Sequence, residues 1–294
     1  MVSASLLFAV MGACVKLASS QYGAGEIVLY RSPVGLVLMG SVMRWRGLSW
    51  RTAVPGMHLW RSVTGATALC LWFLAIGGLP LATAMTLNYM SSVWIALFLM
   101  GGAVLLSPER GNTGAVDPRL VAAVLTGFAG VALVLRPTIE QDQLWFGLVG
   151  LGSGLIAAMA YLQVSALGRV GEPGERVVLY FSATGVVFGA AVALLSGGLH
   201  GHTPGGVGLL LAIGTLATAA QWMMTRAYGG GATLGIAALQ YLGIVFSFFL
   251  GMVLFNEQLT WLSGAGIVLI VAAGVVATLL RERPRSTLAA PTES

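Results

Sequence analysis

The chain has 294 residues, of which 57% are hydrophobic and 9% are charged. Water-soluble domains typically carry about 25% charged residues, so this composition excludes a soluble globular protein and predicts an integral membrane protein. The formal net charge of +5 does not indicate nucleic-acid binding, because the basic residues lie between apolar segments rather than in one cluster.

Apolar segments follow one another along the whole chain, each close to the roughly 20 residues that a helix needs to cross a bilayer. Breaks such as Pro55-Gly56 and Pro173-Gly174 separate them. The first segment has no basic stretch before it and no small-residue cleavage site, so we expect a retained helix rather than a cleaved signal peptide. We predict an all-α integral membrane protein whose ten transmembrane helices span about 3–20, 26–43, 60–77, 82–106, 120–136, 145–167, 176–196, 207–227, 232–254 and 260–280, followed by a polar cytoplasmic tail at 281–294.

The basic residues orient these helices. Twelve of the fifteen fall in loops or helix ends on one side of the predicted membrane, among them Arg46, Arg61 and Arg176. The others are Arg136 in a loop on the opposite side, and Lys16 and Arg31 inside helices. Because cytoplasmic loops are enriched in Lys and Arg, the asymmetry predicts that both termini are cytoplasmic.

The two halves of the chain share motifs at one fixed spacing. Three motifs recur 150 residues later: Val28-Leu29-Tyr30 as Val178-Leu179-Tyr180, Trp72 as Trp222, and Ala82-Thr83 as Ala232-Thr233. We interpret 1–136 and 145–280 as five-helix repeats. An odd number of helices inverts the second repeat, and such repeats place a substrate site in a central cavity near the midplane, where they meet.

One segment then indicates a family. Phe255-Asn256-Glu257-Gln258-Leu259-Thr260, followed by Gly264 and Ala273-Gly274-Val275-Val276, resembles the end of an EamA-type repeat in the drug/metabolite transporter superfamily. Ser107-Pro108-Glu109 with Gly127 and Gly130-Val131 looks like the first-copy version, and Lys16 and Arg31 match basic residues of helices 1 and 2 of that repeat. The resemblance covers nearly the whole chain. Where many members have a proline near the middle of helices 4 and 9, this chain has Ser91-Ser92 and Gly243.

Among members, the chain looks most like the YddG-type exporters of amino acids and related metabolites. The resemblance implies a multi-pass protein of the bacterial inner (plasma) membrane that works by alternating access. It also implies a small-molecule substrate, no cofactor, no nucleic-acid partner and a monomer in the lipid bilayer.

Polar and aromatic residues inside the predicted helices are candidates for substrate binding, because polar groups are costly to place in a membrane. The candidates are Lys16, Trp72, Asn88, Tyr89, Trp94, Tyr161, Gln163, Gln221, Gln240 and Tyr241. Each amide alone has two open interpretations: a hydrogen bond between packed helices, or a cavity wall that orients substrate. Asn88-Tyr89 and Gln240-Tyr241 lie in corresponding stretches of the two repeats, which favours the cavity.

The charged residues near the outer surface have structural alternatives. We predict that Arg31 forms a structural ion pair with Glu257, or with Glu26 in its place. Lys16, the only lysine, either binds a substrate carboxylate or forms an ion pair of this kind. His200-Gly201-His202, in a predicted outer loop, is interpreted as solvated rather than as a metal site.

Three functional classes can be compared. A membrane enzyme needs a nucleophile and base or a metal cluster within the bundle, yet all three histidines are predicted in loops. A channel would need charge rings or a carbonyl filter. A secondary transporter remains, and the absence of acidic residues from predicted helix interiors favours neutral or zwitterionic substrates and an uncoupled facilitator. The alternative is a proton-coupled exporter of cationic drugs.

Overall fold

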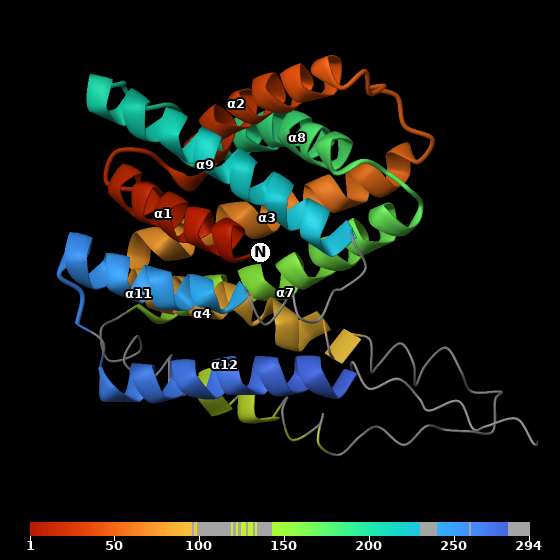
Figure 1. Cartoon of the computed structure of the whole chain (residues 1–294). Coiled ribbons are helices and arrows are strands. Elements are labelled where there is room, and N and C mark those ends of the chain that lie inside the picture. Colours follow the sequence, from red (N-terminus) through yellow and green to blue (C-terminus); the bar gives the residue numbers. More distant parts are fainter. Residues whose placement is uncertain are drawn as a thin grey trace, which may run out of the picture.

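The computed structural model describes residues 1–95, 97–98, 119, 122, 125–127, 129–131, 133, 143–229, 240–258 and 260–281. Its named helices are α1 (Val2–Ala18), α2 (Ala24–Trp45), α3 (Pro55–Gly78), α4 (Leu81–Tyr89), α7 (Leu144–Arg169), α8 (Gly174–Leu195), α9 (Pro204–Gly229), α11 (Leu242–Phe255) and α12 (Trp261–Arg281) (Figure 1). The prediction of an all-α protein is confirmed for these parts of the chain.

Five helices, α2, α3, α7, α8 and α9, are long and apolar enough to cross a membrane. Large apolar side chains also cover much of the outer surface: Trp45 is 87% exposed, Leu195 88% and Trp261 85%. Such a surface suits a hydrocarbon solvent. The predicted spans at 82–106, 120–136 and 232–254 lie partly outside the described residues.

The helices of the first half pack against those of the second half in a paired pattern. α2 packs on α8 and α4 on α11, while α1 packs on α9 as α3 packs on α7. Further contacts are paired too: α2 with α9 and α3 with α8, and α1 with α11 and α4 with α7. Figure 1 shows α2 and α8 side by side, with α1 between α9 and α11.

Small residues allow a close approach between α2 and α8. A Cβ atom on Gly35 would collide with the Ser182 hydroxyl, and one on Gly185 would collide with the Ser32 hydroxyl. Gly189 likewise lies against the backbone of Leu29. Close backbone contact through small residues is the usual way in which helices associate in membranes. The Gly35–Ser182 and Gly185–Ser32 contacts are reciprocal, since each partner lies at the corresponding position of the other helix.

The predicted helix at 82–106 is interrupted, which corrects the expectation of a continuous span. α4 ends at Tyr89, Met90 forms a turn, and the chain is helical again from Ser91. Gly154 of α7 packs directly on the carbonyl groups of Leu87 and Asn88, which an unbroken α4 would use for its next turn. In the second half, Tyr241 forms a similar turn immediately before α11.

α3 begins earlier than predicted. Its first residue is Pro55 rather than a residue near 60, because proline lacks only an N–H group that the first helical turn does not use. His58 and Arg61 are therefore helical and buried, with 1% and 2% of their surfaces exposed. The assignment of Arg61 to the inner-loop charges and of His58 to a loop was wrong.

Candidate functional site

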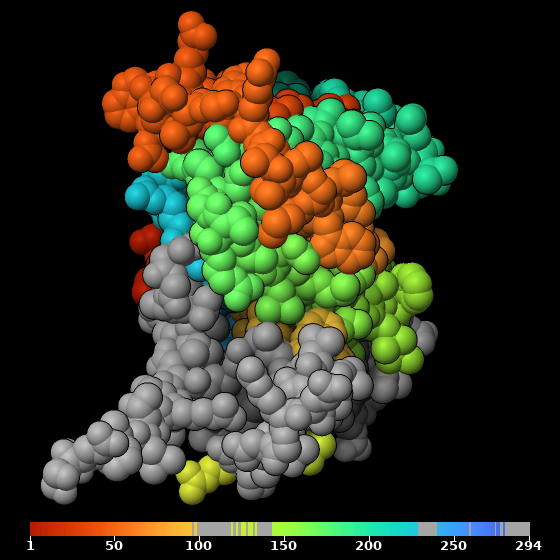
Figure 2. Space-filling view, turned by 90° about the vertical axis from the view of Figure 1, so that its right-hand side faces the viewer, coloured from red at the N-terminus to blue at the C-terminus, as the bar shows by residue number. Residues whose placement is uncertain are grey.

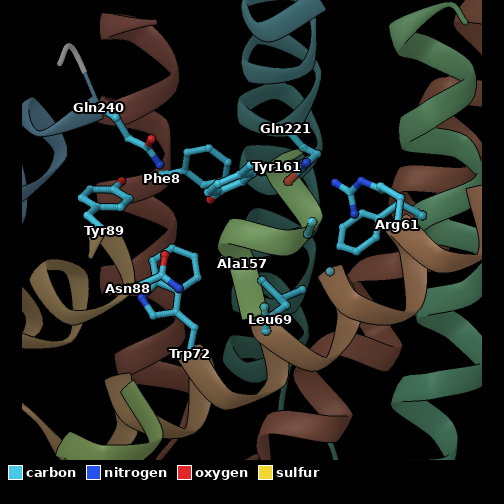
Figure 3. Close-up of a pocket in the computed structure, with 14 residues that line it drawn as sticks. Phe8, Arg61, Leu69, Trp72, Asn88, Tyr89, Ala157, Tyr161, Gln221 and Gln240 are labelled. Carbon is cyan, nitrogen blue, oxygen red and sulfur yellow. The ribbon is translucent and has the colours of Figure 1, made fainter. Parts of the chain in front are cut away.

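A pocket lies in the centre of the bundle, where the helices of the two halves meet (Figure 3). It contains about 510 Å³ of empty space, part of it open to solvent. The residues that line it come from α1, α3, α4, α7, α8 and α9 and from Gln240: Phe8, Arg61, Gly65, Ala68, Leu69, Trp72, Asn88, Tyr89, Ala157, Ala160, Tyr161, Phe181, Gln221 and Gln240. A pocket with aromatic walls and a few polar groups is the usual form of a small-molecule site.

Aromatic side chains form the walls. Phe8 meets Trp72 edge to face, with ring centroids 6.4 Å apart. Tyr161 stacks on Tyr228 of α9 at 5.8 Å and an interplanar angle of 11°. Tyr89 is 2% exposed, and a Cβ atom at Gly243 would collide with its ring. The absence of a side chain at Gly243 thus gives Tyr89 its place beside α11.

The amide groups both line the pocket and join helices. Asn88 donates to the Ser153 hydroxyl at 3.0 Å, and Ser153 donates in turn to the Gly150 carbonyl at 2.6 Å. The Tyr228 hydroxyl donates to the side-chain amide oxygen of Gln240 at 3.0 Å. The two interpretations of these amides are therefore not exclusive. Asn88 and Gln240 each form a hydrogen bond to a side chain of another helix, and each also borders the pocket.

The structure brings together six of the predicted site residues, namely Trp72, Asn88, Tyr89, Tyr161, Gln221 and Gln240. Four others do not line the pocket. Tyr241 is buried in the apolar core, Trp94 packs against that core, Gln163 of α7 is half-buried, and Lys16 is engaged elsewhere. Tyr241 is the N-terminal cap of α11, whereas its neighbour Gln240 lines the pocket.

The predicted ion pair between Arg31 and Glu257 was wrong. Glu257 Oε1 lies 2.5 Å from Lys16 Nζ, and the same lysine donates to the Leu79 carbonyl at 2.5 Å. Glu257 also accepts from the Leu81 backbone N–H at 2.8 Å. These contacts join α1, the α3–α4 link and the end of α11. Predicted membrane depth alone could not distinguish Lys16 from Arg31 as the partner, because the predicted topology puts both near the outer surface.

Arg61 is the pocket residue that sequence reasoning missed. Its guanidinium Cζ lies 4.2 Å from the centroid of the Phe181 ring. Figure 3 shows its guanidinium directed towards the side of the pocket where Gln221 and Tyr161 lie. Arg31 approaches the same Phe181 ring at 5.5 Å. Pro-Gly recurs at the start of α3 and of α9. This recurrence could have shown that α3 begins at Pro55 and that Arg61 is therefore helical.

At one end of the bundle lies a contact that we call the inner contact, after the side that the charge asymmetry predicts for it, and define as Glu172 with its partners. Glu172 accepts from Thr52 at 2.7 Å and from Arg176 at 2.8 Å, and it lies 3.2 Å from His58 Nε2. Burial raises the pKa of Glu172, but the hydrogen bonds from Thr52, Arg176 and His58 outweigh it, and the pKa lies below its usual value. Figure 2 shows this end, with the orange α2–α3 link against the green start of α8.

At the opposite end lies a contact that we call the outer contact, again after its predicted side, and define as Glu26 with its partners. Glu26 accepts from the His200 backbone N–H at 2.7 Å and lies 2.6 Å from His200 Nδ1. His202 Nε2 lies 3.0 Å from the Tyr30 hydroxyl. Both histidines thus bind protein side chains, and the described residues contain no cluster of three or more potential metal ligands.

Comparison of the sequence with known proteins shows the family of the chain. No family model matches the chain. The chain is 35% identical over 275 residues to the pseudopaline exporter of Pseudomonas aeruginosa, an alignment that covers 92% of each chain. The chain belongs to the family of this exporter. Members of the exporter family are transporters rather than enzymes by name, and the chain is accordingly a multi-pass membrane protein of this kind.

Other similarities agree with the exporter family. An uncharacterized transporter of Helicobacter pylori is 27% identical, over 94% of this chain and 92% of its own. The riboflavin transporter of Rhizobium johnstonii is 28% identical over 60% of this chain and 55% of its own. A solved crystal structure that is 21% identical matches with a TM-score of 0.66 over 95% of this chain and 94% of its own, which shows the shared fold.

Proposed function

We propose that the protein is a secondary transporter that exports small zwitterionic metabolites, among them amino acids with aromatic or other apolar side chains. The observation that carries the proposal is the central pocket, lined by aromatic rings and amides, in a chain of the exporter family. Aromatic faces suit the apolar part of such a substrate. The amides of Asn88, Gln221 and Gln240 suit its polar groups.

The transport mechanism that we propose is alternating access by two inverted five-helix repeats, ten helices in all, as in EamA-type transporters. The paired helix contacts support it, because a two-fold relation between the halves exchanges α1·α9 with α7·α3 and leaves α2·α8 unchanged. The reciprocal Gly35–Ser182 and Gly185–Ser32 contacts fit the same relation. Helix interruptions beside a site at the repeat interface are frequent in transporters of inverted-repeat architecture.

The inner and outer contacts supply the two gates of this mechanism. When the repeats rock about the pocket, the inner contact of Glu172 opens on one side while the outer contact of Glu26 remains closed, and the reverse follows. Each contact joins a carboxylate in one half of the chain to a loop of the other half. Glu172, just before α8, binds the α2–α3 loop, and Glu26, at the start of α2, binds the α8–α9 loop. Each of these contacts is a small set of hydrogen bonds at one end of the bundle, whereas the α2–α8 contact extends along both helices, so we expect motion to concentrate at the ends.

We propose further that transport is uncoupled. Proton coupling requires a titratable group within the membrane that exchanges its proton between the two sides. In the described part of the chain no carboxylate or histidine lines the pocket. A cationic drug, the alternative substrate, would meet the cation of Arg61 in this pocket, which disfavours it.

Transport in proteoliposomes tests the proposal. A panel of labelled amino acids, with pseudopaline as a further probe because a relative exports it, should show saturable uptake into vesicles that contain the protein. Asn88→Ala and Gln240→Ala should lower the transport rate while the protein folds normally. Gln143→Ala, which removes an amide just before α7 and outside the pocket, is the matched control. Normal transport by both pocket variants would contradict the assignment of this pocket.

The energy source has its own test. With substrate equal on both sides, a pH difference of about two units across the vesicle membrane should produce no net accumulation. Accumulation driven by the pH difference would refute the facilitator and leave the pocket assignment in place.

A further inference from the structure

The pocket has one cationic wall. Arg61 and Arg31 are 2% and 4% exposed, and both guanidinium groups lie near the Phe181 ring, at 4.2 and 5.5 Å from its centroid. Two positive charges are thus held close together in the middle of an apolar bundle. Arg61 lines the pocket itself.

This charge has no carboxylate partner among the described residues. Arg61 Nε and Nη1 and Arg31 Nε are buried and make no hydrogen bond. The described carboxylates bond elsewhere: Glu26 to His200, Glu172 to Arg176, Glu175 to Arg46 and Glu257 to Lys16. The segment 230–239, which precedes Gln240, contains no Asp or Glu.

A buried cation without a partner is costly. Removing a charge from water costs several kcal/mol, which a nearby anion normally offsets. The Phe181 ring offsets only part of this, because a cation–π contact contributes roughly 2 kcal/mol or less. For stability alone, an apolar residue at position 61 would serve better. The arginine therefore indicates a ligand that supplies the missing negative charge.

The local backbone makes room for Arg61 to reach the pocket. Gly65 lies one turn further along α3, and a Cβ atom there would collide with Arg61 Nη1. The missing side chain lets the guanidinium fold over its own helix. The Arg61 side chain then lies in the pocket wall with Tyr161 and Gln221 (Figure 3). A planar guanidinium fork matches a carboxylate with two parallel hydrogen bonds.

We propose that Arg61 binds the carboxylate of the transported substrate and makes the pocket selective for carboxylate-bearing metabolites. The inference rests on the proposed function and assigns to Arg61 the role that the sequence had left open for Lys16. The apolar part of the substrate then lies towards Trp72 and Tyr89. Arg31, 5.5 Å from the centroid of the Phe181 ring, adds positive potential.

Ligand pairs that differ only in charge test the proposal. Phenylacetate and phenylacetamide have nearly the same shape, as do L-phenylalanine and its amide. The purified full-length protein should be stabilised against heat by each acid at millimolar concentration, with tryptophan fluorescence as a second measure of binding. The acids should bind about 10- to 100-fold more tightly than the amides, as expected for hydrogen bonds to a charged group.

Variants separate binding from folding. Arg61→Met should abolish the preference for acids yet leave the ligand-free protein as stable or more stable. Gly65→Ala should weaken the preference, since it displaces the guanidinium and keeps its charge. Arg169→Gln, at the exposed end of α7, is the matched arginine control.

The proposal would be overturned by equal binding of acids and amides by the unmodified protein, or by a lower stability of ligand-free Arg61→Met. If Arg61→Met keeps the acid preference while Asn88→Ala loses transport, only the role of Arg61 falls and the proposed function stands.

Discussion

The Lys16–Glu257 pair provides a test of how the bundle is held together at its outer end. Lys16→Met removes the ammonium group that binds Glu257 at 2.5 Å and the Leu79 carbonyl at 2.5 Å. It leaves Glu257 bound to the Leu81 N–H alone. Three segments then lose their common contact: α1, the link before α4 and the end of α11.

The magnitude follows from burial. Breaking a fully buried ion pair by removal of one partner costs about 3–5 kcal/mol, whereas an exposed pair contributes about 0–1 kcal/mol. The side chains of Lys16 and Glu257 are 19% and 13% exposed, which places this pair between the limits. We expect Lys16→Met to lower the free energy of unfolding by about 2 kcal/mol.

Denaturant unfolding of the purified protein in detergent measures this change. Glu257→Gln in the Lys16→Met background should recover part of the loss, because it removes the carboxylate left without its partner. The same cycle with Arg31→Met should show additive effects, since Arg31 and Glu257 do not touch. Additive effects for Lys16 with Glu257, or coupling between Arg31 and Glu257, would refute the assignment.

Three further predictions follow from the packing and the ends of the bundle. Single cysteines should be labelled from the outside at position 198 but not at position 46, and outside labelling at 46 would reverse the proposed orientation. Gly35→Val should lower stability by at least 2 kcal/mol through its clash with Ser182, whereas Gly208→Val, where a Cβ atom meets nothing, should have little effect. Because the pKa of Glu172 is lowered on folding, its contribution to stability is present above its ordinary value of 4.5 and is lost as the pH falls through the lower folded value. Unfolding measured between pH 3 and 7 should show this loss, and Glu172→Gln should remove it; an unchanged pH profile would contradict the inner contact.

Several features could be predicted from residue types alone. Composition and the lengths of the apolar segments indicated a helical membrane protein, because lipid excludes any chain that leaves backbone groups unpaired. Intramembrane polarity identified Asn88, Tyr89 and Gln240 as pocket candidates, since such groups are retained only where they find partners or ligands. The rest of the site could not be found in this way. Arg61 was hidden because a basic residue after Pro-Gly has the appearance of a loop charge.

The sequence by itself determined that this is a helical membrane protein and named six of the residues that line the pocket, because these depend on composition and on the cost of polar groups in lipid. Only the tertiary structure decided which side chains meet. Glu257 contacts Lys16 rather than Arg31 because of how α1 and α2 are rotated about their axes. Arg61 reaches the pocket wall because Gly65 leaves space for its guanidinium. Such choices depend on helix rotation and close packing at the scale of a single methyl group, which membrane depth and residue type do not specify.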